Sequence, residues 1–239
     1  MFPLKNKTMR FFFKIVITAF SFIALVSTTN VFAAPVVTPQ IPPRLILSWS
    51  ASSIHPSNYK GKVLPSLNTP IVVSVELLAN GKFADISKTT IIWRKSGEVI
   101  KRGVGLKQIF IAPDSNDSSD VFIDAEVDFA NNVVEQSLLI PVVKPFVSIE
   151  IPYPNSVVRG DSDVTIRATP YFFNASSLDD LVFYWQIGDI KKNMEQNNSI
   201  TLKVSGAYSS QDSLPITSYV QSRDVLTDII VTNKPLFVR

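Results

Sequence analysis

One acidic stretch of the chain carries side chains that can bind a cation. Asp114, Asn116, Asp117 and Asp120 fall within seven residues, and the positions between them are serines. Carboxylate and amide oxygens at this density are the ligands that a hard cation such as Ca²⁺ prefers. The stretch lacks the turn glycine and terminal glutamate of an EF-hand loop, so a solvated loop between strands is the alternative to a calcium site. No other metal site is predicted.

A second group of residues has the chemistry of a binding surface. Tyr171, Phe172 and Phe173 are successive aromatic residues in a predicted strand, where neighbouring side chains point to opposite faces, so at least one must point outward. Tyr184 is expected on the outer face of a strand that buries Trp185. Aromatic side chains dominate many protein interfaces. We therefore predict that these four aromatic residues bind a partner, the alternative being a domain interface or a position under a loop.

The composition leaves few residues for catalysis. The chain contains no cysteine and one histidine, His55, so disulfide scaffolds, thiolate zinc sites and cysteine nucleophiles are excluded and histidine chemistry is disfavoured. No G-x-S-x-G pattern marks a serine nucleophile. We expect no catalytic residues and no cofactor, and the chain is predicted not to be an enzyme.

The N-terminal residues follow the order of a secretory signal. An apolar run begins at Phe11 and ends at Val26, and the small-residue site Val31-Phe32-Ala33 follows it. The basic residues that precede or interrupt the run are Lys5, Lys7, Arg10 and Lys14. Its uninterrupted part is shorter than the roughly 20 residues of a spanning helix, which favours cleavage over an uncleaved anchor. Residues 1–33 are predicted as a signal peptide of a protein exported to the cell envelope, cell surface or extracellular space.

The leader also accounts for the basic isoelectric point of about 9.0. The full chain has 23 basic and 20 acidic residues, but the four charged residues of 1–33 are all basic, which leaves 19 basic and 20 acidic residues after them. A net charge of about −1 provides no basic stripe for nucleic acid. We expect no nucleic-acid partner, and membrane contact only through the signal segment if it stays uncleaved.

Hydrophobic residues recur with period two from Arg44 onward. Residues 121–129 alternate between apolar odd-numbered positions and mainly acidic even-numbered positions, as in a strand with one buried face. Turn signals such as Asn80-Gly81 and Ser96-Gly97 separate the runs. Strands are expected near residues 45–49, 71–77, 91–94, 107–112, 121–129, 133–143, 147–151, 164–168, 181–187, 200–204, 214–221 and 228–232. Since no 3.6-residue periodicity is sustained beyond the leader, the pattern predicts an all-β fold.

The strands divide into two similar halves. Pro141 and Pro145 interrupt the pattern, because two prolines so close together cannot both donate to a sheet ladder. Trp93 and Trp185 occupy corresponding places in the two halves, and a glycine follows each closely, at Gly97 and Gly188. This repeat predicts two copies of one fold. The predicted segments are a signal peptide (1–33), a proline-rich stalk (34–43), and immunoglobulin-like β-sandwiches over 44–143 and 144–239.

The turn after the second tryptophan resembles that of a known module. Trp185-Gln-Ile-Gly188-Asp189 resembles the W-x-F-G-D turn of the PKD family, with Ile187 in place of the usual Phe, and the first copy reads Trp93-Arg-Lys-Ser-Gly97-Glu98 with one extra residue. The chain therefore resembles the wider bacterial immunoglobulin-like and PKD-like superfamily. This resemblance implies a non-catalytic envelope or secreted module that is arrayed in tandem.

These observations predict an exported protein that serves as an adhesion, assembly or spacer module. Its expected fold is two tandem immunoglobulin-like antiparallel β-sandwiches, and its expected partner is a protein or a surface glycan of the cell envelope. Two alternatives remain open, an accessory subunit of a secreted enzyme and a membrane-tethered scaffold of an envelope complex.

Cleavage after Ala33 predicts a mature chain that begins at Ala34, because small residues occupy the signal-peptidase site. Mass spectrometry of the exported protein should detect an N-terminal peptide that starts at Ala34. An exported chain that retains Met1 would contradict cleavage and favour the tethered scaffold.

Overall fold

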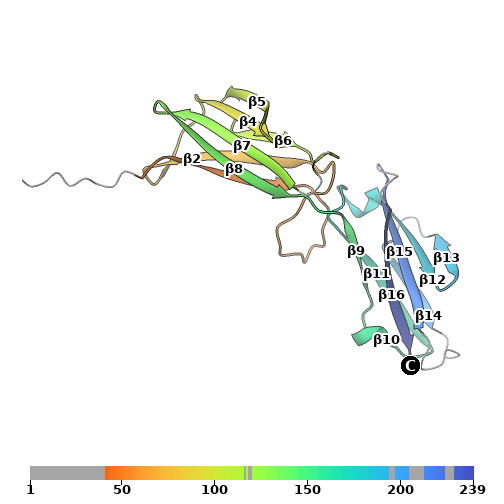
Figure 1. Ribbon diagram of the computed structural model, residues 1–239. Helices are drawn as coiled ribbons and strands as arrows, with labels where there is room; N and C mark the ends of the chain where they lie inside the picture. The colour runs from red at the N-terminus through yellow and green to blue at the C-terminus, as the bar shows by residue number, and fades with distance from the viewer. Residues whose placement is uncertain (1–40, 116, 118–119, 194–196, 205–212, 224–228) are drawn as a thin grey trace, which may run out of the picture. The chain divides into compact units, whose positions relative to one another are not determined.

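The structure is a computed structural model that describes residues 41–115, 117, 120–193, 197–204, 213–223 and 229–239, with side chains left undescribed at 191–193. The predicted signal peptide, most of the predicted stalk and Asn116 lie outside the described residues. The described residues form antiparallel sheets in two successive groups, with two short 3₁₀ turns, η1 (Pro154–Ser156) and η2 (Leu178–Asp180), in the second group (Figure 1).

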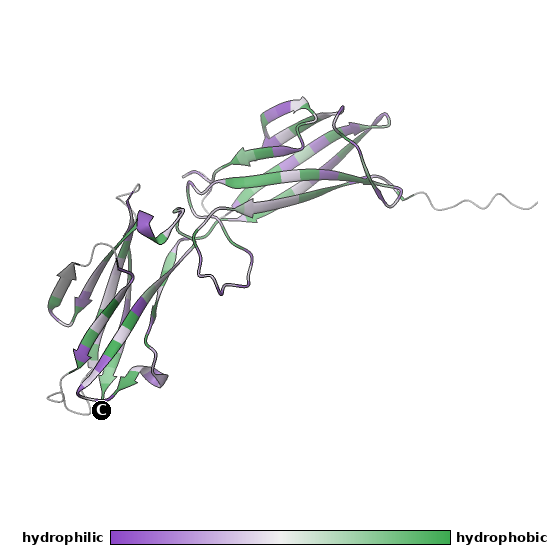
Figure 2. Cartoon of the chain, turned by 180° about the vertical axis from the view of Figure 1, so that it is seen from behind, coloured by the Kyte–Doolittle hydropathy of each residue, from purple (hydrophilic) through white to green (hydrophobic). Residues whose placement is uncertain are grey.

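The first group of strands forms two sheets. Its strands are β1 (Arg44–Ala51), β2 (Ile71–Ala79), β3 (Lys82–Ala84), β4 (Thr90–Lys95), β5 (Glu98–Val104), β6 (Gln108–Ile111), β7 (Asp120–Phe129) and β8 (Asn132–Pro141). One sheet has the order β1-β2-β3, with β6 also paired to β2, and the other has the order β5-β4-β7-β8. Apolar side chains between the two sheets form one buried cluster, and Figure 2 shows how hydrophobic and hydrophilic residues are interspersed along the strands.

The second group repeats this arrangement. Its strands are β9 (Phe146–Glu150), β10 (Val157–Val158), β11 (Ser162–Tyr171), β12 (Leu181–Ile187), β13 (Ile190–Asn193), β14 (Ser199–Val204), β15 (Ser213–Ser222) and β16 (Ile229–Val238). The sheets are β14-β11-β9 and β13-β12-β15-β16-β10, and a separate apolar cluster lies between them. The two-residue β10 pairs in parallel with β16, and the other pairings in this group are antiparallel. Both groups are immunoglobulin-like sandwiches, which confirms the predicted fold class.

Most predicted strands are present, and the differences have physical reasons. The sequence misses β5, because nearly all of its residues are exposed and no alternation marks a buried face. The prediction near 228–232 is too short, since β16 continues to Val238 through Asn233-Lys234-Pro235, a run that resembles a turn. A third error concerns Phe172 and Phe173, which were expected within a strand but follow the end of β11 at Tyr171.

Each sandwich is organised around a tryptophan on a central strand. Trp93 on β4 and Trp185 on β12 are at most 1% exposed. The indole Nε1 of Trp93 donates to the carbonyl oxygen of Leu106 at 2.8 Å, two residues before β6 begins. The indole of Trp185 donates to the carbonyl oxygen of Asn197 at 3.4 Å, two residues before β14 begins. Both indoles therefore donate to the opposite sheet at equivalent places.

The residue after each acceptor makes a second hydrogen bond that is also equivalent in the two copies. The backbone amide of Val75 on β2 donates to the carbonyl oxygen of Lys107 at 2.9 Å, and that of Ala168 on β11 donates to the carbonyl oxygen of Asn198 at 2.7 Å. In each copy, consecutive carbonyl groups thus accept from the tryptophan of one sheet and from a strand of the other. A repeated hydrogen-bond frame of this kind supports the prediction of two copies of one fold.

The glycines that follow the tryptophans lie in the turns that leave the central strands. Gly97 has φ of +86° between β4 and β5, and Gly188 has φ of +56° between β12 and β13. These backbone angles are left-handed, a region that favours glycine. The two W-to-G spacings noted in the sequence therefore mark equivalent hairpins.

Replacing either tryptophan with alanine should destabilise the sandwich that contains it by about 3 to 5 kcal/mol, because a large cavity forms and a buried carbonyl group loses its donor. Chemical denaturation of Trp93→Ala and Trp185→Ala measures this loss. Phe83→Ala is a matched control, since Phe83 is 68% exposed, and it should change the free energy of unfolding little. Equal effects at Phe83 and Trp93 would contradict the role of the buried indole.

Candidate functional site

The successive aromatic residues 171–173 lie against a loop rather than open to solvent. Phe172 and Phe173 are 6% and 3% exposed, and Phe172 has a left-handed φ of +61°. The amide of Phe172 donates to the carbonyl oxygen of Ile54 at 2.7 Å, and the amide of Ile54 donates to the carbonyl oxygen of Phe173 at 3.0 Å. This short antiparallel bridge ties the segment to the loop that joins β1 to β2.

Aromatic rings reinforce the same contact. Tyr171 stacks on Phe146 with ring centroids 4.6 Å apart and an interplanar angle of 4°. Tyr59, from the loop after β1, meets Tyr171 and Phe172 edge to face at 6.1 and 5.6 Å. The structure therefore places three of the four predicted partner-binding residues in contacts within this chain, and it leaves their predicted role in partner binding untested.

The fourth predicted residue, Tyr184, lies on a different surface. The burial of β12 alternates strictly, so Tyr184 points away from the core that encloses Trp185. Tyr184 pairs with Tyr219 on β15, and Tyr219 pairs with Val231 on β16. Residues paired in this way across adjacent strands lie side by side on one sheet face. The outer face of β12, β15 and β16 therefore carries the row Tyr184–Tyr219–Val231.

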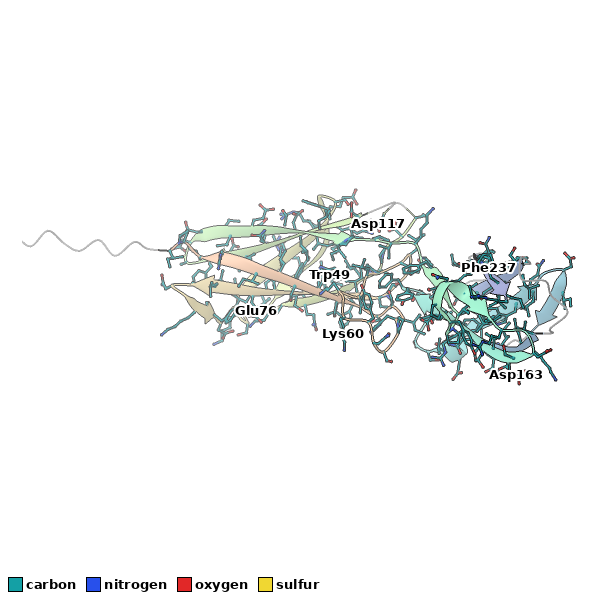
Figure 3. The ribbon with its side chains drawn as sticks, turned by 90° about the horizontal axis from the view of Figure 1, so that it is seen from below. Trp49, Lys60, Glu76, Asp117, Asp163 and Phe237 are labelled. Atoms are coloured by element: carbon teal, nitrogen blue, oxygen red, sulfur yellow. The ribbon has the colours of Figure 1, made fainter. Side chains whose placement is uncertain are left out.

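This outer face is apolar and uncharged over a large area. Val231 and Ile229 are 55% and 51% exposed, whereas the two tyrosines are half-buried. The register places the following residues on the face: Val182, Tyr184, Gln186, Pro215, Thr217, Tyr219, Gln221, Ile229, Val231, Asn233, Pro235 and Phe237. None of them is an aspartate, glutamate, histidine, lysine or arginine. Phe237, at the end of this face, is labelled in Figure 3.

The polar side chains at the centre of this face bond to one another. The hydroxyl of Tyr219 donates to Oε1 of Gln186 at 3.1 Å, and Nε2 of Gln186 donates to the carbonyl oxygen of Gly188 at 3.0 Å. Both ends of the Gln186 amide are thus occupied within the chain. These two hydrogen bonds fix the orientation of the Tyr219 and Gln186 side chains on the face.

The corresponding face of the first sandwich has the opposite chemistry. The tryptophans provide the alignment, because Trp93 pairs with Ala125 as Trp185 pairs with Ser218. The residue before each tryptophan points to the outer face and begins a row across three paired strands. This row is Ile92, Glu126 and Glu135 in the first copy and Tyr184, Tyr219 and Val231 in the second.

An ionic network occupies the centre of that first face, whose other exposed residues include Phe122, Val133 and Leu139. The guanidinium of Arg94 lies 2.7 Å from the carboxylate of Glu126 and 3.9 Å from that of Glu135. The hydroxyl of Ser137 donates to the carboxylate of Asp124 at 2.6 Å. The same sheet position is thus compatible with charged residues, and the fold does not require tyrosine or valine there.

In the acidic stretch of residues 114–120, two aspartates form ion pairs with the ammonium group of a lysine. Nζ of Lys95 lies 2.6 Å from Oδ2 of Asp117 and 3.0 Å from Oδ2 of Asp114. Asp117 is 6% exposed, and its carboxylate also accepts the backbone amide of Asp114 at 2.7 Å. Asp117 is labelled in Figure 3. Asp120 begins β7, and Asn116 lies outside the described residues, so the predicted calcium site stays a prediction.

The carboxylates around Lys95 change its pKa. Burial lowers the pKa of Lys95, but its hydrogen bonds to Asp117 and Asp114 and their negative charges raise it further, so the net pKa lies above the ordinary 10.5. A raised pKa in the folded state means that the ion pair stabilises the fold at neutral pH. This contribution is lost as the pH rises above 10.5 and the lysine deprotonates.

Residues with catalytic side chains are not assembled into a site in the described part of the chain. His55 is exposed, and its Nδ1 lies 3.2 Å from the carbonyl oxygen of Ser53. Ser57 and Lys60 have the S-x-x-K spacing of one class of serine nucleophile, but both are exposed, and a catalytic lysine needs burial to lower its pKa. Across the described ranges, no three acidic or histidine side chains gather as a metal site would require.

Sequence reasoning identified Tyr184 but missed Tyr219 and Val231. Alternation within residues 214–221 was visible, yet only the register between β12, β15 and β16 shows that these residues form one row. The contrast with Glu126 and Glu135 was present in the sequence as well. Aligning the two copies on Trp93 and Trp185 would have revealed it.

Comparison with known proteins gives matches among solved structures alone. No protein-family model and no curated protein matches the sequence. The three N-terminal domains of the Highly Immunogenic Outer Capsid protein (Hoc) of bacteriophage RB49 are 11% identical over 82% of this chain, with a TM-score of 0.45. The chain covers 59% of that structure, which is less than two thirds of its length.

Two further structures are similar at a lower level. The fibronectin(III)-like modules of CbhA from Clostridium thermocellum are 12% identical, with 81% of this chain and 94% of theirs covered and a TM-score of 0.30. SGBP-B of the mixed-linkage glucan utilization locus of Bacteroides ovatus, in complex with a mixed-linkage heptasaccharide, is 14% identical, with 84% of this chain and 48% of that chain covered and a TM-score of 0.24. The immunoglobulin-like fold of the present chain is defined by its own strand order and register. The described residues include no helix with the length and hydropathy of a membrane span.

Lys95→Met should lower the free energy of unfolding by about 2 kcal/mol at neutral pH, because the buried carboxylate of Asp117 loses its counter-charge. Denaturant unfolding at pH 7 measures the loss, and the difference from wild type should shrink as the pH rises above 10.5. Lys101→Met is the control, since Lys101 is exposed on β5. Equal stability of wild type and Lys95→Met would show that the ion pair contributes nothing.

Proposed function

We propose that this chain is an exported, non-enzymatic module for adhesion, assembly or spacing, and that it binds a protein through the outer face of β12, β15 and β16. The observation that carries this proposal is the contrast between the two copies. At the centre of its outer sheet face the first copy carries Glu126 and Glu135, paired with Arg94, whereas the second copy carries Tyr219 and Val231 at the equivalent positions. The fold does not require apolar residues at these positions, and their exposure to water is unfavourable. A binding partner that covers them would explain why they are there.

A protein partner fits this face better than a glycan does. The exposed area is contributed largely by Ile229, Val231 and aromatic rings, and charged side chains are absent from its described positions. Charge depletion and aromatic enrichment are typical of the centre of a protein interface. A glycan needs free hydrogen-bonding groups, but the amide of Gln186 is used within the chain.

The remaining aromatic residues have a different role in this proposal. Tyr171, Phe172 and Phe173 contact Ile54, Tyr59 and Phe146, so we assign them to the packing of the loop after β1. Of the four residues predicted for partner binding, Tyr184 alone belongs to the proposed surface.

The export and non-enzymatic parts of the proposal rest on sequence and on chemistry. The signal-like order of residues 1–33 supports export. The ion pairs of Lys95 with Asp117 and of Arg94 with Glu126 join neighbouring strands and turns of the first sandwich, which is consistent with a structural role. An accessory subunit of a secreted enzyme would use the same surface, with the enzyme as its partner.

A photo-reactive amino acid placed at Val231 tests the proposal in the cells that produce the protein. Irradiation should yield a covalent adduct with another polypeptide chain, because Val231 is the most exposed residue of the row. The same amino acid at Thr201, which is exposed on the outer face of β14 in the opposite sheet, should yield far less adduct. No adduct at Val231, or equal adducts at both positions, would refute this surface.

A further inference from the structure

The uncharged face of the second sandwich is compatible with a copy of itself. In a symmetric dimer the same surface patch serves both copies, so a patch with charges of one predominant sign repels its counterpart, whereas a patch without charges does not. The described residues of the face, centred on Tyr219 and Val231, have no formal charge at neutral pH. The equivalent face of the first sandwich has an excess of acidic groups, with Asp124, Glu126, Asp128 and Glu135 around Arg94.

The other outer face of the second sandwich is less suited to self-association. The strands β11 and β14 carry Asp163, Arg167 and Lys203 at exposed positions, and Asp163 pairs with Lys203 across the two strands. Desolvating such groups is costly. The β12–β15–β16 face is therefore the uncharged apolar surface of this sandwich, as far as its side chains are described.

The size of the face sets the strength of association. The strands β15 and β16 have 10 residues each and β12 has seven. At about 3.4 Å per residue and about 4.8 Å between strands, three strands cover on the order of 450 Å². Two facing copies would bury about 900 Å², slightly below the roughly 1,000 Å² of a stable interface. The expected complex is a weak one, with a Kd in the micromolar range or above.

We propose that the protein bound by this face is a second copy of the same chain, in a weak symmetric dimer formed by the β12–β15–β16 faces. This inference rests on the proposed function and names its partner. The preorganised contact between Tyr219 and Gln186 presents the same apolar surface in both copies. A glycan, or a different protein, is the alternative occupant that the experiment distinguishes.

Sedimentation velocity of the exported protein over a range of concentrations tests the dimer. The wild type should shift from monomer to dimer between low-micromolar and millimolar concentrations. Val231→Glu and Tyr219→Glu should stay monomeric throughout, because each buries an uncompensated negative charge in both halves of the interface. These variants install the residues that the first copy carries at equivalent positions, Glu135 and Glu126, so the sheet is expected to tolerate them.

Thr201→Glu is the matched control, because it adds the same charge to an exposed position of the opposite sheet and should dimerise as the wild type does. Thermal melts verify that each variant is folded, and Val231→Glu decides the outcome if Tyr219→Glu fails to fold. A wild type that is monomeric at every concentration, or a folded Val231→Glu that dimerises normally, would overturn the dimer. If the wild type is monomeric while Val231 still cross-links to a different polypeptide, the dimer falls and the proposed function stands.

Discussion

Burying an indole between two sheets imposes a constraint on everything around it. The N–H group of a fully enclosed tryptophan needs an acceptor, since an unpaired buried donor costs about 1 to 3 kcal/mol. In both copies the acceptor is a backbone carbonyl just before a strand of the opposite sheet, at Leu106 and at Asn197. The acceptor must therefore enter the opposite sheet at a fixed distance from the central strand. This requirement fixes the distance between the start of β6 and β4, and between the start of β14 and β12.

The repeated hydrogen bonds of the two tryptophans constrain the core but not the side chains on the outer faces of the sheets, so these faces can differ. Side chains on the outer face contribute little to the core, so their identities reflect solvent or a partner. In the first copy, Arg94 and its acidic neighbours keep the face hydrated. In the second copy, Gln186 takes the place of Arg94, and Tyr219 and Val231 take the places of Glu126 and Glu135. One fold thus supports charged residues in one sandwich and uncharged residues at the equivalent positions of the other.

Much of the fold could be predicted from the sequence, because period-two alternation marks strands with one buried face. The strand β7 is predictable in this way, whereas β5 is not, since residues such as Val99 and Val104 are exposed on an edge strand. The binding row was only partly predictable. Tyr184 follows from the alternation of β12, but its neighbours depend on the register with β15 and β16, which local pattern does not determine. Similarly, the pairing of Lys95 with Asp117 joins residues on different strands and turns, beyond the reach of local spacing.

The proposed binding surface implies that a partner covers the outer face of β12, β15 and β16 in the cells that produce the protein. Hydroxyl-radical footprinting with mass spectrometry measures this directly, because side-chain oxidation reports solvent access. We expect Tyr184, Tyr219 and Val231 to be oxidised several-fold more slowly in the cells that export the protein than in dilute purified protein. Phe122 and Leu139, on the outer face of the first sandwich, should be oxidised at similar rates in both samples. Equal oxidation of the tyrosine row in cells and in dilute solution would contradict the account.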